Sequence, residues 1–169
     1  MLEASIANNY VGYTDPASRP TTNEDRALLM TCLEEKRDAS GPAGYPIQIL
    51  GNKFIGPGKS ALVEIQEQGT GEQRLRFERV FFSNNYCLHN PPPPGTDVPR
   101  TAATVNLFGR VATVMGNQVK APRLATGAAS FPSFNFNGMP GPFIGNVISG
   151  GVSLHTDFPA PLANFNLTA

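Results

Sequence analysis

The chain has 169 residues, which is long enough for one domain with a single core. Its 13 basic and 13 acidic residues cancel, and a net charge near zero favours association with other molecules. No apolar run approaches the ~18–20 residues that a membrane-spanning helix needs. The two cysteines, Cys32 and Cys87, form no CxxC pair, so neither a disulfide framework nor a metal site is expected.

The first 20 residues are predicted to form an extended N-terminal arm. Pro16 and Pro20 exclude a helix there. Tyr10 and Tyr13 give the arm apolar groups with which it could hold a neighbouring subunit.

One helix is predicted at residues 22–39. Thr21 and Glu24 have the spacing of a capping box, in which each side chain satisfies a free amide of the first turn. Gly41 and Pro42 are expected to end this helix.

A β core is predicted over residues 45–155, since the 17 Gly and 16 Pro suit many short strands joined by loops. Residues 60–67 and 73–82 alternate apolar with polar side chains, which predicts an antiparallel hairpin. Its inward face is expected to hold Ala61, Val63, Ile65, Leu75 and Phe77. We find no internal repeat. The predicted fold is therefore an all-β single domain (1–169), an antiparallel β-sandwich or jelly-roll barrel with one short N-terminal helix and extended terminal arms.

Residues 83–100 are predicted to form a long loop that contains four consecutive prolines, Pro91–Pro94. These prolines favour a stiff polyproline II segment. Because loops of this length in compact domains are usually functional or linking, the segment is a candidate binding loop.

No catalytic, cofactor or metal motif emerges from the remaining residues. Gly56-Pro57-Gly58-Lys59-Ser60 fails the phosphate-loop spacing, because Lys53 stands where that motif requires glycine. Cys87 and His89 share a strand face without forming a nucleophile–base pair. Nucleic-acid contact through a cluster of arginines is a weak possibility, since Phe77 alternates with them and points inward. These arginines are Arg74, Arg76 and Arg79.

The last third of the chain, residues 124–169, has one formal charge, Asp157, and six of the eleven phenylalanines. An apolar, uncharged chain end would be a liability in water unless something covers it. The segment 156–169 is therefore predicted to be a C-terminal arm that contacts another polypeptide. The expected contact residues are Phe158, Leu162, Phe165 and Leu167, with Tyr10 and Tyr13 of the N-terminal arm.

Three segments together, residues 1–20, 60–82 and 124–169, resemble in style the small virion proteins, especially bacteriophage coat or decoration proteins with a single β-barrel. The resemblance implies a jelly roll, arms that bind neighbouring subunits, and no catalysis. It predicts a structural virion protein that self-associates and contacts other coat subunits, with no cofactor and no small-molecule substrate, located in the virion after synthesis in the host cytoplasm. The alternative is a non-enzymatic β-sandwich that presents loop 83–100 to a carbohydrate or protein.

Overall fold

The computed structural model describes residues 4–12, 26–31, 46–57, 61–66, 77–91, 102–122, 131–154 and 167–168. Every regular element among these residues is a β-strand, and none is a helix. All the strand pairs are parallel, from β1 with β4 to β12 with β14.

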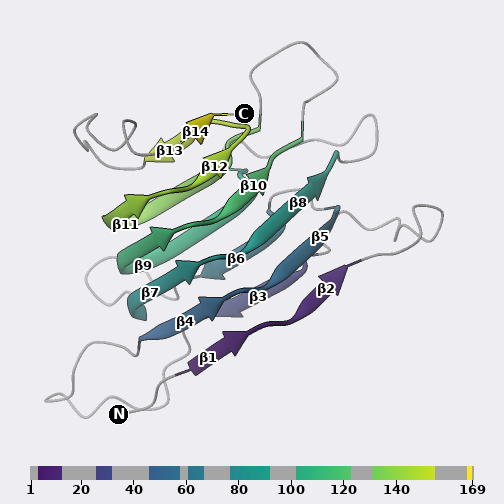
Figure 1. Cartoon of the computed structure of the whole chain (residues 1–169). Helices are drawn as coiled ribbons and strands as arrows, with labels where there is room; N and C mark the ends of the chain where they lie inside the picture. Colours follow the sequence, from purple (N-terminus) through teal and green to yellow (C-terminus); the bar gives the residue numbers. More distant parts are fainter. Residues whose placement is uncertain are drawn as a thin grey trace, which may run out of the picture.

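Two parallel sheets run side by side along the described part of the chain (Figure 1). The first sheet contains, in hydrogen-bonded order, β1 (Ala4–Ala7), β4 (Ile47–Leu50), β7 (Phe77–Ser83), β9 (Val105–Met115), β11 (Phe134–Ile144) and β13 (Val152–Leu154). Two further strands join it through β9, namely β6 (Val63–Gln66), which pairs with β9, and β3 (Leu28–Thr31), which pairs with β6. The second sheet contains, in order, β14 (Leu167–Thr168), β12 (Val147–Ile148), β10 (Gln118–Lys120), β8 (Tyr86–Asn90), β5 (Lys53–Pro57) and β2 (Tyr10–Gly12).

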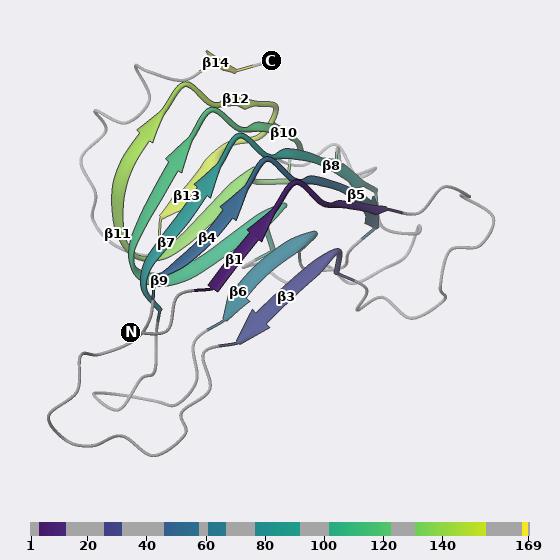
Figure 2. The ribbon, with the colours of Figure 1, turned by 60° about the horizontal axis from the view of Figure 1, so that its bottom comes forward.

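The chain builds both sheets by stacking successive passes on one another. One pass runs through β1, β2 and β3, and the next runs through β4, β5 and β6, each strand pairing with its counterpart. The sheets curl around the core, so that the molecule looks like half of a barrel (Figure 2). This is the arrangement of a β-solenoid, in which each pass contacts only its neighbours.

Strands β9 and β11 bend, and each supplies two faces of the stack. The first half of β9 pairs with β6, and its second half pairs with β7. Inward residues change parity along it, from Val105 and Leu107 to Ala112 and Val114. Gly109 lies at this bend, where an added Cβ would meet Val80 Cγ2 at 2.7 Å, so the close approach of β7 requires glycine.

A two-residue turn joins the first sheet to the second in five passes. The first turn residue has positive φ, at Asn8, Gly51, Asn84, Gly116 and Gly145. Gly and Asn adopt this left-handed conformation most readily. The second turn residue is always asparagine: Asn9, Asn52, Asn85, Asn117 and Asn146.

These five asparagines form a hydrogen-bonded ladder along the stack. The backbone N–H of Asn52 donates to Asn85 Oδ1 at 2.9 Å, and the Asn52 side-chain amide donates to the same oxygen at 3.0 Å. Asn85 repeats the pattern toward Asn117, and Asn117 repeats it toward Asn146. Asn52, Asn85, Asn117 and Asn146 are buried, and the ladder satisfies polar groups that would otherwise be costly inside the fold.

Several sequence-based predictions are wrong. The antiparallel sandwich or jelly roll is replaced by parallel stacking. β6 pairs with β3 and β9, and β7 pairs with β4 and β9, so these two described strands do not form the expected hairpin with each other. Alternation marks a half-buried strand but does not specify the direction of its partner. An internal repeat exists as well, in the five asparagine turns.

The predicted helix and N-terminal arm also need correction. Leu28–Thr31, inside the expected helix 22–39, is strand β3, because pairing with β6 outweighs local helix signals. Residues 4–7 and 10–12, inside the expected arm, are β1 and β2. Four of the five expected inward residues, Ala61, Val63, Ile65 and Phe77, are buried as predicted, and Leu75 lies outside the described residues.

Replacing Gly116 with alanine should destabilise the protein. Gly116 has φ of +65°, and an added Cβ would lie 2.5 Å from Asn84 Oδ1. A left-handed backbone costs a residue with a Cβ about 1–2 kcal/mol, which is the loss we expect in urea unfolding. Gly151→Ala is the matched control, because nothing lies within 4 Å of its Cβ position. Equal midpoints for both variants would contradict the need for glycine in this turn.

Candidate interaction surfaces

The N-terminal end of the stack leaves part of the apolar core uncovered. Val11 on β2 occupies the same inward row as Phe54, Cys87 and Val119, as the strand register shows. Val11 is 38% exposed, whereas Phe54 is 1% exposed. The difference arises because β2 pairs with β5 on one side, and no described residue pairs with its other side. Terminal passes of solenoids need a cover for such surfaces.

Two tyrosines flank a lysine on the outer face of the second sheet. Tyr10, Lys53 and Tyr86 are neighbours in register on β2, β5 and β8. The Lys53 ammonium lies 5.3 Å from the centre of the Tyr10 ring and 5.7 Å from that of Tyr86. Such cation–π contacts are worth about 0.5–1 kcal/mol at exposed sites, and the contact with Tyr10 links β2, at the open end, to Lys53 on β5.

A row of polar side chains lies on the outer face of the first sheet. Leu29, Glu64, Asn106 and Asn135 are successive neighbours in register on β3, β6, β9 and β11. They alternate with inward core residues such as Val63, Val105 and Phe134, so they point away from the core. Leu29 is 49% exposed, but Glu64, Asn106 and Asn135 are buried. We call these last three residues the polar row.

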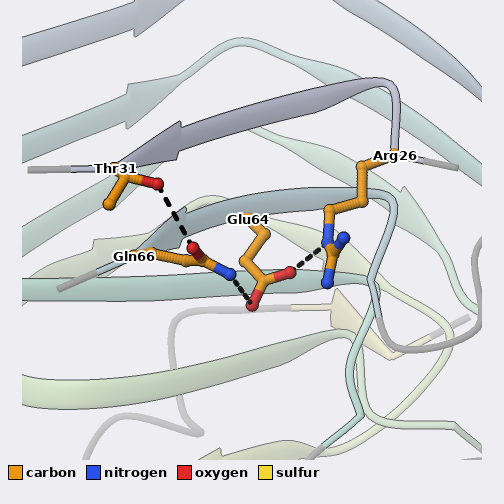
Figure 3. A network of polar contacts seen from close by, with 4 residues as sticks. All are labelled: Arg26, Thr31, Glu64 and Gln66. Carbon is orange, nitrogen blue, oxygen red and sulfur yellow. Dashed lines mark hydrogen bonds and ion pairs between the residues drawn. The ribbon is translucent and has the colours of Figure 1, made fainter. Parts of the chain in front are cut away.

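Glu64 is held in place by a chain of hydrogen bonds (Figure 3). The Arg26 Nε–H donates to one carboxylate oxygen of Glu64 and forms an ion pair with it. The Gln66 side-chain amide donates to the other oxygen at 3.1 Å, and Thr31 Oγ1 donates to Gln66 Oε1 at 3.2 Å. The charge of Glu64 is thus balanced, and its orientation is set by residues of two segments, 26–31 and β6 itself.

Asn106, in the middle of the polar row, contains an unsatisfied buried atom. Asn106 is 4% exposed, and its Oδ1 has no hydrogen-bond partner among the described residues. Buried polar atoms are nearly always paired, so each exception needs an explanation.

The described cysteine and histidine, Cys87 and His89, are both buried inside the fold. Burial raises the pKa of the Cys87 thiol, which lies in the core next to Phe54 and Val119 in register. His89 is 2% exposed, its Nδ1 lies 3.2 Å from Thr104 Oγ1, and its ring packs edge-on against Phe131. Among the described residues, no three His, Cys, Asp or Glu side chains gather to hold a metal ion.

The structure places only part of the predicted contact residues. Tyr10 is 55% exposed on β2, as a subunit contact would require. Leu167 lies on β14, whose backbone pairs with β12 of the same chain. Tyr13, Phe158, Leu162 and Phe165 lie outside the described residues. Contact of the C-terminal segment with another copy therefore stays a prediction.

The other predicted sites are placed as follows. Residues 83–90 are not a loop, since they complete β7, turn at Asn84-Asn85 and form β8. His89 points into the core, which removes it from any binding loop there. Arg79 is exposed on β7, and Arg74 and Arg76 lie outside the described residues. No described helix is long and apolar enough to cross a membrane.

The sequence analysis missed the asparagine ladder and the polar row. The ladder has a detectable signal in the sequence, a pattern of six residues. Gly or Asn followed by Asn stands at the centre, one residue of any type lies on each side of this pair, and an apolar residue lies at each end, as in Ile49–Phe54 and Val114–Val119. Its copies are separated by 43, 33, 32 and 29 residues. The polar row has a weaker signal, because a single Asn between two apolar residues also suits an ordinary solvent-facing position.

Comparison with known proteins gave no relative. A scan of protein-family models, a search of curated proteins and a search of solved structures each found no match to this chain.

Proposed function

We propose that this protein is a non-enzymatic structural subunit that self-associates through the N-terminal end of its stack, in the setting of a virion. The observation that supports this most directly is the exposed inward side chain of Val11, at the open end of the core. Exposed apolar surface next to unpaired strand edges is a template for another chain.

The chemistry of this end favours a second copy as the partner. The edge strands β1 and β2 expose no charged side chain, as their sequences Ala4–Ala7 and Tyr10–Gly12 contain none. The chain has no net charge that would keep copies apart. A two-fold dimer in which both copies use this same end would cover both open cores, since such interfaces are self-complementary.

The non-enzymatic part of the proposal is supported by the roles of the reactive side chains. Cys87 and His89 are core residues, and the Glu64 carboxylate is paired with Arg26. The virion setting extends the resemblance in style that residues 1–20, 60–82 and 124–169 have to small coat and decoration proteins. Regular stacking with a continuous amide ladder suits a rigid building block of such a particle.

Val11→Lys should reduce self-association. A lysine at this position can reach solvent past the edge of the core, so the monomer should still fold, but a charge would be buried in the interface. We expect the mass in light scattering to fall toward 18.0 kDa, the mass of one chain. Circular dichroism would verify that the variant retains its β structure.

Met115→Lys is the matched control for this experiment. Met115 is similarly exposed, at 42%, but lies on β9 in the middle of the first sheet. This variant should keep the mass of the parent protein. A parent protein that is monomeric at working concentration, or a Val11→Lys variant of unchanged mass, would refute the proposed interface. Electron microscopy of concentrated samples would then test whether the associated form builds closed particles.

A further inference from the structure

We propose that the outer face of the second sheet binds single-stranded nucleic acid. The central residues of this face are Lys53 on β5 and Tyr86 on β8, which are neighbours in register, with Tyr10 on the other side of Lys53. Binding of this kind needs basic and aromatic side chains that are interleaved on one accessible face. Lys53 is exposed, Tyr10 is 55% exposed and Tyr86 is half-buried, so an extended ligand can contact them from solvent.

A second row of side chains extends this surface. Ile55, Leu88 and Lys120 are neighbours in register on β5, β8 and β10. They alternate with the inward residues of these strands, so they share the outer face with Lys53 and Tyr86. Ile55 and Leu88 are half-buried, and Lys120 is exposed. The face therefore combines aromatic and apolar contact area with two positive charges.

The charge of this face selects an anionic ligand. The described strands of the second sheet contain Lys53 and Lys120 but no Asp or Glu. Among the described residues, neither lysine forms an ion pair, whereas Arg26 and Arg110 are each paired with a glutamate on the first sheet. Both ammonium groups can therefore neutralise phosphates, which is the contact that dominates affinity for nucleic acids.

The contacts of Lys53 favour nucleic acid over other anionic partners. Its ammonium group lies over the Tyr10 ring, 5.3 Å from the ring centre, and over the Tyr86 ring, 5.7 Å from the centre. Each ring has a second face, and every nucleobase has a π-face that can stack on an aromatic side chain. A phosphate at the lysine and a base on a tyrosine are the groups that alternate along a single strand. An acidic peptide or a duplex supplies the charge without an unstacked base.

This proposal is independent of the proposed self-association. The interface proposed above is the N-terminal end of the stack, at β1 and β2, whereas Lys53, Tyr86 and Lys120 lie along the side of the stack on β5, β8 and β10 (Figure 1). A copy bound at the end leaves this side accessible. Tyr10 lies on β2 itself, so the variants that test nucleic-acid binding are placed at Tyr86 and Lys53.

Tyr86→Ala tests the stacking contact. The probe is a fluorescein-labelled oligothymidylate, and its anisotropy at low salt measures binding. The parent protein should bind the probe, and Tyr86→Ala should weaken binding by about 5- to 150-fold, the range for loss of one stacked base. Tyr86→Phe keeps the ring and should bind like the parent protein. Phe81→Ala is the matched control, because Phe81 is a half-buried aromatic residue on the outer face of the first sheet, and this variant should also bind like the parent.

Lys53→Gln tests the phosphate contact without removing a ring. It should weaken binding, and the plot of log affinity against log salt concentration should become less steep by about 0.7, the slope for one phosphate of a single strand. Arg79→Gln is the matched control. Arg79 is an exposed cation on the first sheet without an ion pair among the described residues, so its variant should keep the slope of the parent.

The same measurements can overturn the proposal. Absence of oligothymidylate binding by the parent protein at low salt would do so, as would equal losses of affinity in Tyr86→Ala and Phe81→Ala. A slope that changes in Arg79→Gln and not in Lys53→Gln would place the contact on the first sheet and would also refute it. The last test replaces oligothymidylate with an abasic deoxyribose-phosphate polymer of the same length. Equal affinity for both polymers would show attraction of any polyanion by charge alone and would overturn the assignment to nucleic acid.

Discussion

Phe134→Ala is expected to lower the free energy of unfolding by about 3–5 kcal/mol, the range for truncating a fully buried phenylalanine. Phe134 is 0% exposed and forms the centre of an aromatic cluster. Its ring lies 6.1 Å from that of Phe82, 5.9 Å from that of Phe136 and 5.3 Å from that of Phe143. The loss should be large because strands β7 and β11, and both halves of β11, meet at this ring. Urea unfolding followed by circular dichroism measures it.

Phe81→Ala is the control for ring removal as such. Phe81 lies on β7 next to Phe82 in sequence, but it is half-buried on the outer face. Its truncation should cost clearly less than that of Phe134, because less apolar surface is lost and no closed cavity forms. Similar losses for the two variants would show that the cluster around Phe134 is not the centre of the core.

Asn117→Ala is expected to be comparably damaging, although it removes a polar side chain. Asn117 Oδ1 accepts from the backbone N–H of Asn85 at 2.9 Å, and Asn117 Nδ2 donates to the Phe82 carbonyl at 2.8 Å. Alanine would leave both buried backbone groups without these partners. Each such group costs about 1–3 kcal/mol, so we expect a total loss of roughly 2–6 kcal/mol in urea unfolding.

Asn84→Gly is the matched control for the ladder. Asn84 is an exposed asparagine in the equivalent turn of the preceding pass, with φ of 56°. Glycine already occupies this position in the turns at Gly51, Gly116 and Gly145, so the substitution should change stability little. A small effect of Asn117→Ala would mean that water replaces the missing amide and that the ladder adds little to stability.

Short-range patterns in the sequence were sufficient to locate much of the core. Alternation identified Val63 and Ile65, which are fully buried. Pairing direction was not predictable in this way, because a half-buried strand has the same alternation in a parallel or an antiparallel sheet. Parallel pairing becomes apparent only when the five asparagine turns are compared across intervals of 29 to 43 residues.

The helix prediction failed for a related reason. The Thr21–Glu24 capping box and the Gly41-Pro42 stop satisfy local helix rules, but local propensity is a weak prior. Leu28 and Met30 instead pack on the core as alternate residues of β3. The polar row was hidden for the opposite reason: Asn106 fits its strand pattern well, and only the structure shows that this outward position is buried.

The unequal spacing between the ladder asparagines indicates where the chain can accept insertions and deletions during evolution. The spacing falls from 43 to 29 residues along the chain, while every rung keeps N···O distances of 2.9–3.1 Å. Each pass is therefore aligned at its turn, and residues may be added or removed elsewhere in the pass without shifting the strands above and below. Because closing a longer loop costs only ~0.6 kcal/mol per doubling of its length, insertions between strands are cheap. The connections can thus diversify freely while the turn asparagines remain constrained.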